Sequence, residues 1–258
     1  MIDIAHSEKK EGFAFLFYAH FAYIHNNLNI LYLEKDSKSR IGYEGKGVIY
    51  MLGIIRVLTS EGKVLSEHGE LMRDFLSIDS ETKCIMDQPK GIYNAQTEQE
   101  AIPKIVELAR GMEKSGKYKA LTISCAADPA LQEVKQAVSI PVYGAGAVGA
   151  NISKTLGDNV GVIGITEEAP PNILKVLGNH FYSYHYEPTL RNTVSLFSDD
   201  AKNKLVMLMN RMKEEGADVI LFACTGFSTI HLKQFAKDRV TIPMVDLVEA
   251  QAVAYKLQ

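Results

Sequence analysis

Two cysteines occupy matching places in the two halves of this sequence, and their placement suggests proton-transfer chemistry. Cys125 and Cys224 each follow an apolar, β-branched run that is typical of a buried strand, and each precedes a helical pattern. An Ile-Pro step into a further short strand comes later in both halves, at Pro141 and at Pro243. Two thiols at equivalent strand ends can face each other across a cleft. A two-base proton-transfer enzyme requires this arrangement.

The local sequence after each cysteine favours the same chemistry. Ligands of parallel α/β sheets bind beyond the carboxyl ends of the strands, where helix N-termini point. A helix N-terminus there stabilises a thiolate, so we expect the cysteine pKa values to fall from about 8.5 toward neutrality. The backbone N–H groups of the following turns could bind a carboxylate or a developing enolate oxygen; they belong to Ala126, Ala127, Thr225 and Gly226. If the carbonyl of the substrate stabilises the carbanion, such a site needs no cofactor.

The elements that must position these cysteines alternate between strand and helix, which predicts an α/β fold with largely parallel sheets. We expect strands at residues 52–58, 83–86, 121–124, 159–166, 181–186 and 218–223. We expect helices at residues 64–76, 98–114, 199–215 and 247–257. Pro103 fits only the first turn of the second of these helices, so its start could be later than residue 98. In the first helix we expect the inward positions to be Leu65, Leu71, Met72, Phe75 and Leu76.

The second half of the chain repeats the pattern of the first, which predicts two pseudo-symmetric lobes with the active site in the cleft between them. We place the first α/β lobe at residues 51–146 and the second at residues 147–246. The C-terminal helix, 247–258, would pack back on the first lobe. The glycine-rich stretch Gly144–Gly149 reads as a connector between the lobes and lacks the context of a nucleotide-binding loop.

Residues 1–50 do not continue this pattern. Their apolar stretch at residues 13–24 is too short to span a membrane, and no cleavage site of a signal peptide follows it. Two interpretations stay open: a peripheral N-terminal extension, or a mis-assigned start with translation beginning at Met51. The functional interpretation does not depend on residues 1–50.

Composition excludes several classes of protein. The net charge of −3 and the pI of about 6.2 do not show the excess of positive charge that is typical of proteins that bind nucleic acid or an anionic membrane. The three cysteines show neither a disulfide framework nor the spacing of a metal site, which suggests a reducing, cytoplasmic setting. Cys84 lies within a predicted strand, where a core thiol is expected. The expected partner is a small-molecule substrate, and the sequence leaves association into a homo-oligomer open.

From Met51 to the C-terminus the chain resembles the aspartate/glutamate/hydantoin racemase superfamily. Both cysteine motifs and both Ile-Pro steps carry the resemblance. The segment Cys125–Pro129 is most similar to the hydantoin racemase branch, in which a spaced Asp-Pro pair follows the first cysteine, and the segment Ile242–Ala250 is similar to the ending of that branch. One departure is that Arg56–Ser60 stands where those enzymes often have an Asn-Pro-Asn segment.

Several further residues are candidates for substrate binding, each with a structural alternative. Arg56 could bind a substrate carboxylate bidentately or form an ion pair at the strand end. Thr59 and Thr166 follow the first strand of each half and could contact substrate or serve as turn residues. Asp128 could orient the first thiol or cap the helix that Pro129 opens.

Together these features predict a cofactor-independent racemase or epimerase that acts on a carbon next to a carbonyl. Cys125 and Cys224 would be its acid/base pair, and the substrate would be a 5-substituted hydantoin or an amino acid. Two alternatives stay open. One is a decarboxylase or cis-trans isomerase of the arylmalonate decarboxylase or maleate isomerase type, although retention of both cysteines counts against a decarboxylase. The other is a two-lobed metabolite-binding protein without catalytic activity.

Overall fold

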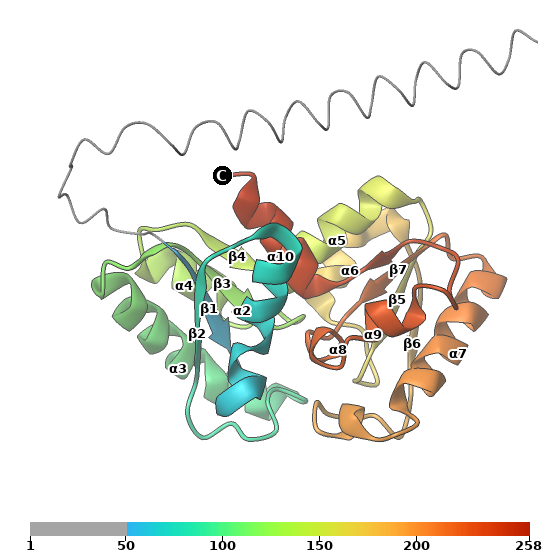
Figure 1. Ribbon diagram of the computed structural model, residues 1–258, viewed down its shortest axis with the longest axis horizontal. Helices are drawn as coiled ribbons and strands as arrows, with labels where there is room; N and C mark the ends of the chain where they lie inside the picture. Colours follow the sequence, from blue (N-terminus) through green and yellow to red (C-terminus); the bar gives the residue numbers. More distant parts are fainter. Residues whose placement is uncertain (1–50) are drawn as a thin grey trace, which may run out of the picture. The chain divides into compact units, whose positions relative to one another are not determined.

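A computed structural model describes residues 51–258, and within them two four-stranded parallel sheets carry the fold (Figure 1). The first sheet has the order β2-β1-β3-β4 and the second the order β6-β5-β7-β8, so the two sheets repeat one topology. The strands are β1 (Met51–Arg56), β2 (Ser80–Cys84), β3 (Tyr118–Ser124), β4 (Val142–Gly144), β5 (Val160–Gly164), β6 (Phe181–Tyr186), β7 (Val219–Phe222) and β8 (Met244–Val245). The predicted α/β fold is confirmed.

Helices flank both sheets. The long ones are α2 (Gly62–Leu76), α3 (Ala95–Lys114), α5 (Ala145–Leu156), α7 (Ala201–Glu215) and α10 (Leu247–Lys256). Short helices are α4 (Leu131–Ala137), α6 (Pro171–Leu177), α8 (Gly226–Thr229) and α9 (Leu232–Ala236), with 3-10 turns η2 (Gly178–His180) and η3 (Ser195–Phe197). None of the helices within residues 51–258 combines the length and apolar character that a bilayer span needs.

The central strands form because their sequences are almost continuously apolar and buried on both faces. Every residue of β5 and of β7 is buried, as are five of the six residues of β1. Strands covered by helices on both faces have this composition. In an antiparallel strand with one solvent-exposed face, apolar and polar residues would alternate. The outer strand β2, in contrast, is half-buried throughout, and it occupies residues 80–84 rather than the predicted 83–86.

Helix α3 begins earlier than predicted, and Pro103 lies in its interior rather than in its first turn. The reason is a capping box that the sequence analysis overlooked. The Asn94 side chain accepts a hydrogen bond from the Thr97 N–H at 2.8 Å, and the Thr97 hydroxyl accepts one from the Asn94 N–H at 3.1 Å. These bonds satisfy two of the free N–H groups of the first turn, so they stabilise a helix start before Glu98.

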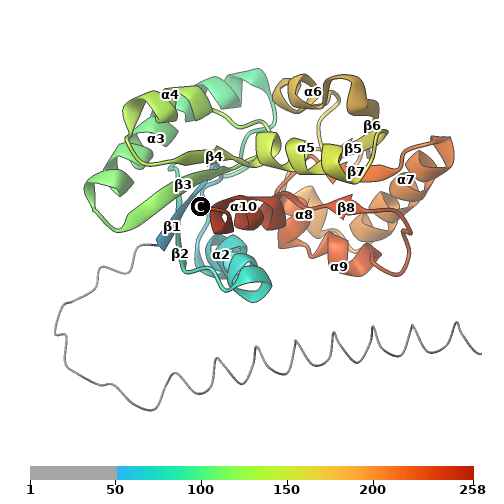
Figure 2. The same ribbon diagram turned by 90° about the horizontal axis from the view of Figure 1, so that it is seen from above.

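Of the glycine-rich stretch predicted to connect the lobes, Gly144 ends β4 and the rest forms the first half of α5, the helix between β4 of the first sheet and β5 of the second. Helix α10 packs against both α5 and α2, and Figure 2 shows it lying between them. Its Val248 and Ala252 join Leu52 and Ile54 of β1 in one buried apolar cluster. The last helix of the chain therefore packs on the first sheet, while its own N-terminus continues directly from β8 of the second.

Candidate active site

A cavity of about 340 Å³ lies where the carboxyl ends of β1, β3, β5 and β7 meet, and it contains most of the predicted site residues. Those that line it are Arg56, Cys125, Ala126, Ala127, Thr166, Cys224, Thr225 and Gly226. Thr59 lines a second cavity of about 250 Å³. The two cavities adjoin, because both are lined by Arg56, Leu58, Thr193 and Gly226. Asp128 is absent from the lining of both.

Each cysteine follows a central strand of a different sheet, and backbone N–H groups approach each sulfur. Cys125 comes directly after β3, and the N–H of Ala127 lies near its sulfur and lowers its pKa. Cys224 follows β7; the Phe227 N–H donates to its carbonyl oxygen at 3.2 Å, and the N–H groups of Gly226 and Phe227 lie near its sulfur and lower its pKa. The structure therefore brings both thiols to one cavity.

The expectation of thiol pKa values near neutrality is wrong for this structure. Burial raises the pKa of Cys125 to about 12 and the pKa of Cys224 to about 11, because both sulfurs are withdrawn from water. The N–H donors, and for Cys224 also Arg56, lower the pKa by less than burial raises it. At neutral pH both groups are therefore predominantly thiols, and either needs a further interaction to become a base.

Arg56 ends β1 with its side chain in the wall of the cavity and only 4% of the residue exposed. One guanidinium N–H donates to the carbonyl of Val64. Among residues 51–258, no carboxylate lies within ion-pair distance of this guanidinium. Burial lowers its pKa to about 10, so it is a cation at neutral pH. A buried cation without an anionic partner is suited to bind an anionic group in the cavity.

Asp128 acts on α5 rather than on the helix after Pro129. Its carboxylate accepts hydrogen bonds from the N–H groups of Gly146 at 2.8 Å and Ala147 at 2.7 Å, and from the Asn172 amide at 2.8 Å. Burial raises the pKa of Asp128 to about 6. These bonds fasten the first turn of α5 to the loop that carries Cys125. Neither predicted alternative for Asp128 included this contact.

The fastening of α5 depends on its glycines. A Cβ on Gly146 would lie 2.0 Å from the carbonyl oxygen of Ala126, and a Cβ on Gly144 would lie 2.5 Å from the Asp128 carboxylate carbon. Side chains never approach so closely, so both positions require glycine for their packing. Ala126 directly follows Cys125, and the position of the first thiol is therefore coupled to the start of α5.

His68 is a residue that the sequence analysis missed. It lies on α2, it is completely buried, and its ring connects the two cysteine segments. Nδ1 is 2.9 Å from the hydroxyl of Ser124, which precedes Cys125, and Nε2 is 3.1 Å from the hydroxyl of Thr229 on α8. Burial, which disfavours the charged ring, lowers the pKa of His68 well below its usual value. The neutral imidazole therefore links a segment of each sheet through hydrogen bonds alone.

On α2, Met72 is buried as predicted, and Leu71 and Leu76 pack against a buried apolar cluster, but the centre of the buried face is polar. The buried residues of α2 are Glu67, His68, Gly69 and Met72, whereas Phe75, predicted to point inward, is 46% exposed. Gly69 permits close approach to β2, because a Cβ there would lie 2.8 Å from the Ser80 hydroxyl. The spacing of apolar residues could not indicate the buried face of α2, because Glu67 and His68 lie at its centre. Their polar side chains are paired with residues of other elements.

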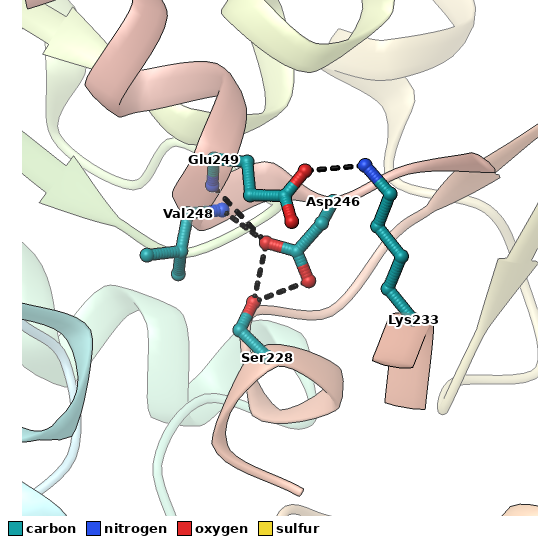
Figure 3. Close-up of polar contacts among 5 residues, drawn as sticks. All are labelled: Ser228, Lys233, Asp246, Val248 and Glu249. Atoms are coloured by element: carbon teal, nitrogen blue, oxygen red, sulfur yellow. Dashed lines mark hydrogen bonds and ion pairs between the residues drawn. The ribbon is translucent and has the colours of Figure 1, made fainter. Parts of the chain in front are cut away.

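A second buried polar cluster supports the Cys224 segment (Figure 3). The Asp246 carboxylate accepts hydrogen bonds from the Ser228 hydroxyl at 2.8 Å and from the N–H groups of Val248 at 2.8 Å and Glu249 at 3.2 Å. Asp246 thereby caps the N-terminus of α10 and holds α8, the helix that follows Cys224. At the edge of the cluster, Lys233 pairs with Glu249.

The remaining predicted residues have partners within the protein. The Thr59 hydroxyl donates to the Ile85 carbonyl at 2.9 Å and accepts from the Gln88 N–H at 2.7 Å. The Thr166 hydroxyl donates to the Glu168 carbonyl at 2.8 Å while still lining the main cavity. Cys84 is half-buried rather than a core thiol, since it ends the outer strand β2.

In the part of the chain that the structure describes, no cluster of three or more His, Cys, Asp or Glu side chains has the geometry to hold a metal ion. Residues 1–50 lie outside this part, so the two interpretations of that segment stay predictions.

Several solved structures are similar to this chain in fold. Allantoin racemase from Klebsiella pneumoniae matches with a TM-score of 0.69 at 17% identity, over 81% of this chain and 86% of that chain. A glutamate racemase from Bacillus anthracis matches with a TM-score of 0.59 at 18% identity, over 81% and 80%. A mutant of arylmalonate decarboxylase in its liganded form matches with a TM-score of 0.59 at 14% identity, over 80% and 92%. At these identities the likeness concerns the fold alone.

Sequence comparison identifies the family directly. No curated protein matches the chain at a significant level. The profile of the family described as Asp/Glu/Hydantoin racemase, however, matches residues 79–255, which is more than half of the chain and includes both cysteine segments. The chain therefore belongs to the Asp/Glu/Hydantoin racemase family.

Proposed function

We propose that the protein is a cofactor-independent racemase or epimerase in which Cys125 and Cys224 form the acid/base pair. The observation that carries this proposal is the shared cavity. Two cysteines from the carboxyl ends of two different sheets line one space of about 340 Å³, which is large enough for a small substrate. Membership of a racemase family supports the same reaction class.

The proposed reaction moves one proton off and one proton onto a single carbon. One cysteine, as its thiolate, takes the hydrogen of the carbon next to the carbonyl, and the C–H electron pair moves into the enolate. The other cysteine, as a thiol, gives its proton to the opposite face, and that electron pair re-forms the C–H bond with inverted configuration. The enolate oxygen would accept hydrogen bonds from the N–H groups of Ala126 and Thr225, which in the turns Ala126–Ala127 and Thr225–Gly226 are the ones not directed at a sulfur.

The cavity wall suggests the substrate class. Apolar side chains form much of the lining: Val57, Leu58, Ile92, Ile165, Ala169 and Pro171. The charged side chains in the lining are Arg56, Glu98 and Glu168. We propose a 5-substituted hydantoin or an amino acid whose carbonyl end faces the cysteines, and whose substituent lies on the apolar wall. Arg56 would bind an anionic group of such a substrate, and Thr59 and Thr166 would lie at the margins.

The need for reduced thiols also suggests the cellular compartment in which the protein acts. Cys84, Cys125 and Cys224 are all free, and an acid/base pair of thiols works only while it is reduced. We therefore propose the cytoplasm as the site of action.

A substrate panel tests the proposal. Enantiopure 5-substituted hydantoins, allantoin and amino acids would be incubated with wild type, Cys125→Ser and Cys224→Ser, and optical rotation followed. We expect one substrate class to lose rotation with wild type only. A variant that racemises as fast as wild type contradicts the two-thiol mechanism. Release of CO₂ from an arylmalonate, or isomerisation of maleate, without racemisation identifies one of the alternative enzymes. Tight binding without turnover identifies a binding protein.

A further inference from the structure

The sheets themselves do not fix the distance between the two cysteines. Strand β3 ends at Ser124, immediately before Cys125, and β7 ends at Phe222, shortly before Cys224. The ladder bonds join strands within one sheet, so neither ladder connects one cysteine to the other. A two-base mechanism needs both groups at a fixed separation, on opposite faces of one carbon. That separation therefore depends on contacts between the segments that carry the cysteines.

One hydrogen bond joins these two segments directly. The hydroxyl of Thr225, which follows Cys224, donates to the carbonyl of Ser124, which precedes Cys125, at 3.2 Å. Thr225 and Ser124 are both buried, so water does not compete for this bond. The sequence predicted Thr225 as a substrate-binding residue, but its hydroxyl is directed at the other cysteine segment.

A second path between the segments runs through the buried ring of His68. Its Nδ1 is 2.9 Å from the Ser124 hydroxyl, and its Nε2 is 3.1 Å from the hydroxyl of Thr229 on α8, the helix that follows Cys224. The carbonyl of Ser124 thus accepts from one residue of the Cys224 segment, and its hydroxyl is linked through the ring to another. We call Ser124, His68, Thr225 and Thr229 the Ser124 network.

Gln251 of α10 gives the bonds of the Ser124 network a direction. Its Oε1 accepts from the Thr122 hydroxyl at 3.0 Å, so its amide nitrogen faces the Ser124 hydroxyl at 3.5 Å and donates to it. The Ser124 hydroxyl then donates its own hydrogen to Nδ1 of His68, and the Nε2–H of the ring donates to Thr229. A neutral imidazole satisfies both contacts at once, and the ring is held from two sides.

We propose that the Ser124 network sets the separation of the two thiols, and that Thr225 and His68 are positioning residues for racemisation. The proposal rests on the two-cysteine function proposed above. A catalytic group displaced by about 1 Å can lose about 100-fold in rate. Loss of one path through the network should therefore lower kcat. It should leave KM nearly unchanged, because the Thr225 hydroxyl and the His68 ring bond to the protein and not to substrate.

Cross-linking without substrate measures the separation. A series of bis-alkylating reagents, lengthened by a single methylene at each step, would be reacted with the protein, and mass spectrometry would give the fraction in which Cys125 is linked to Cys224. The second alkylation is intramolecular, so it is fastest when the spacer matches the gap. We expect wild type to favour a single spacer. Thr225→Val, which keeps the side-chain shape but loses the hydroxyl, should link about fivefold more slowly with that spacer and accept its neighbours better.

Two further variants make the test specific. Thr225→Ser keeps the hydroxyl and should keep the wild-type spacer preference. Ser153→Ala is the matched control, because it also removes a buried hydroxyl that donates to a backbone carbonyl, that of Gly149 at 2.9 Å, but it lies in α5 and lines neither cavity. In racemisation assays, Thr225→Val should lose about 10- to 100-fold in kcat with KM within about twofold, while Thr225→Ser and Ser153→Ala stay near wild type.

Three results would overturn the proposal: a wild type that links equally well with every spacer, a Thr225→Val variant with the wild-type preference, or a Thr225→Ser variant no better than Thr225→Val. If urea unfolding shows that Thr225→Val does not fold, Thr229→Val decides by the same measurement, because it cuts the path through His68. Cross-linking needs no substrate. A wild type that racemises nothing but shows the expected spacer preferences would therefore refute the proposed function and leave the positioning role standing.

Discussion

Replacing Gly146 with alanine tests whether the first turn of α5 positions the Cys125 segment. The new Cβ would lie 2.0 Å from the Ala126 carbonyl oxygen and 2.6 Å from the Asn172 amide nitrogen. Because a side-chain carbon needs at least 3.0 Å, the Ala126 backbone or α5 must move by about 1 Å. The contact is with backbone and not with the end of a flexible side chain, so a change of rotamer cannot relieve it.

Both stability and activity are expected to fall. Overpacking of a buried site costs about 1–3 kcal/mol of unfolding free energy. The movement also strains the bonds from Asp128 to the N–H groups of Gly146 and Ala147. A misplacement of a catalytic group by about 1 Å can cost about 100-fold in rate, and Cys125 is bonded directly to Ala126. We therefore expect kcat for racemisation to fall by about 100-fold in a protein that still folds.

Urea unfolding and racemisation assays on the same preparations measure both effects. Gly111→Ala is the matched control, because Gly111 lies inside α3 with nothing within 4 Å of its added Cβ. That control should gain about 0.5–1 kcal/mol and keep its kcat. If Gly146→Ala unfolds within about 0.5 kcal/mol of wild type and keeps kcat within about twofold, the coupling between α5 and Cys125 is refuted.

Three further predictions follow from the buried groups. Catalysis needs one thiolate, and the thiol pKa values are about 11 and 12, so kcat/KM should rise roughly tenfold per pH unit from about pH 7 to pH 10; a flat profile contradicts this. His68→Leu removes a hydrogen-bond partner from the buried Ser124 hydroxyl and from the half-buried Thr229 hydroxyl, and should lose about 1–3 kcal/mol in urea unfolding, against a smaller loss for His68→Gln; equal losses contradict the hydrogen-bonding role. Ser228→Ala removes a donor to the buried Asp246 carboxylate and should also lose about 1–3 kcal/mol by the same assay; an unchanged midpoint contradicts the supporting role of this contact.

The central strands could be predicted from the sequence because burial on both faces requires nearly continuous apolar runs, as in β5 and β7. The position of both cysteines after such strands followed from the same pattern. The half-buried edge strand β2 gave no comparable signal, and its predicted range was three residues late at its start. The start of α3 depended on the reciprocal bonds of Asn94 and Thr97, which outweigh the apparent restriction from Pro103.

The supporting residues of the site could not be predicted, because their roles depend on contacts between distant segments. His68 bonds to Thr229, which is 161 residues further along the chain. Asp128 bonds to α5, although its neighbour Pro129 suggested a local cap. The thiol pKa values were predicted in the wrong direction, because helix ends and N–H donors are visible in the sequence pattern whereas the burial of each sulfur is not.

If two thiols exchange protons with one carbon, hydrogen from solvent must enter the stereocentre, and solvent deuterium exchange followed by proton NMR measures this entry. An enantiopure substrate from the panel would be incubated in D₂O with wild type, Cys125→Ser and Cys224→Ser. We expect that wild type incorporates deuterium at the stereocentre while optical rotation is lost, and that both variants lose this activity. Racemisation at the wild-type rate in either variant, or racemisation by wild type without incorporation of solvent deuterium, would contradict the two-thiol mechanism.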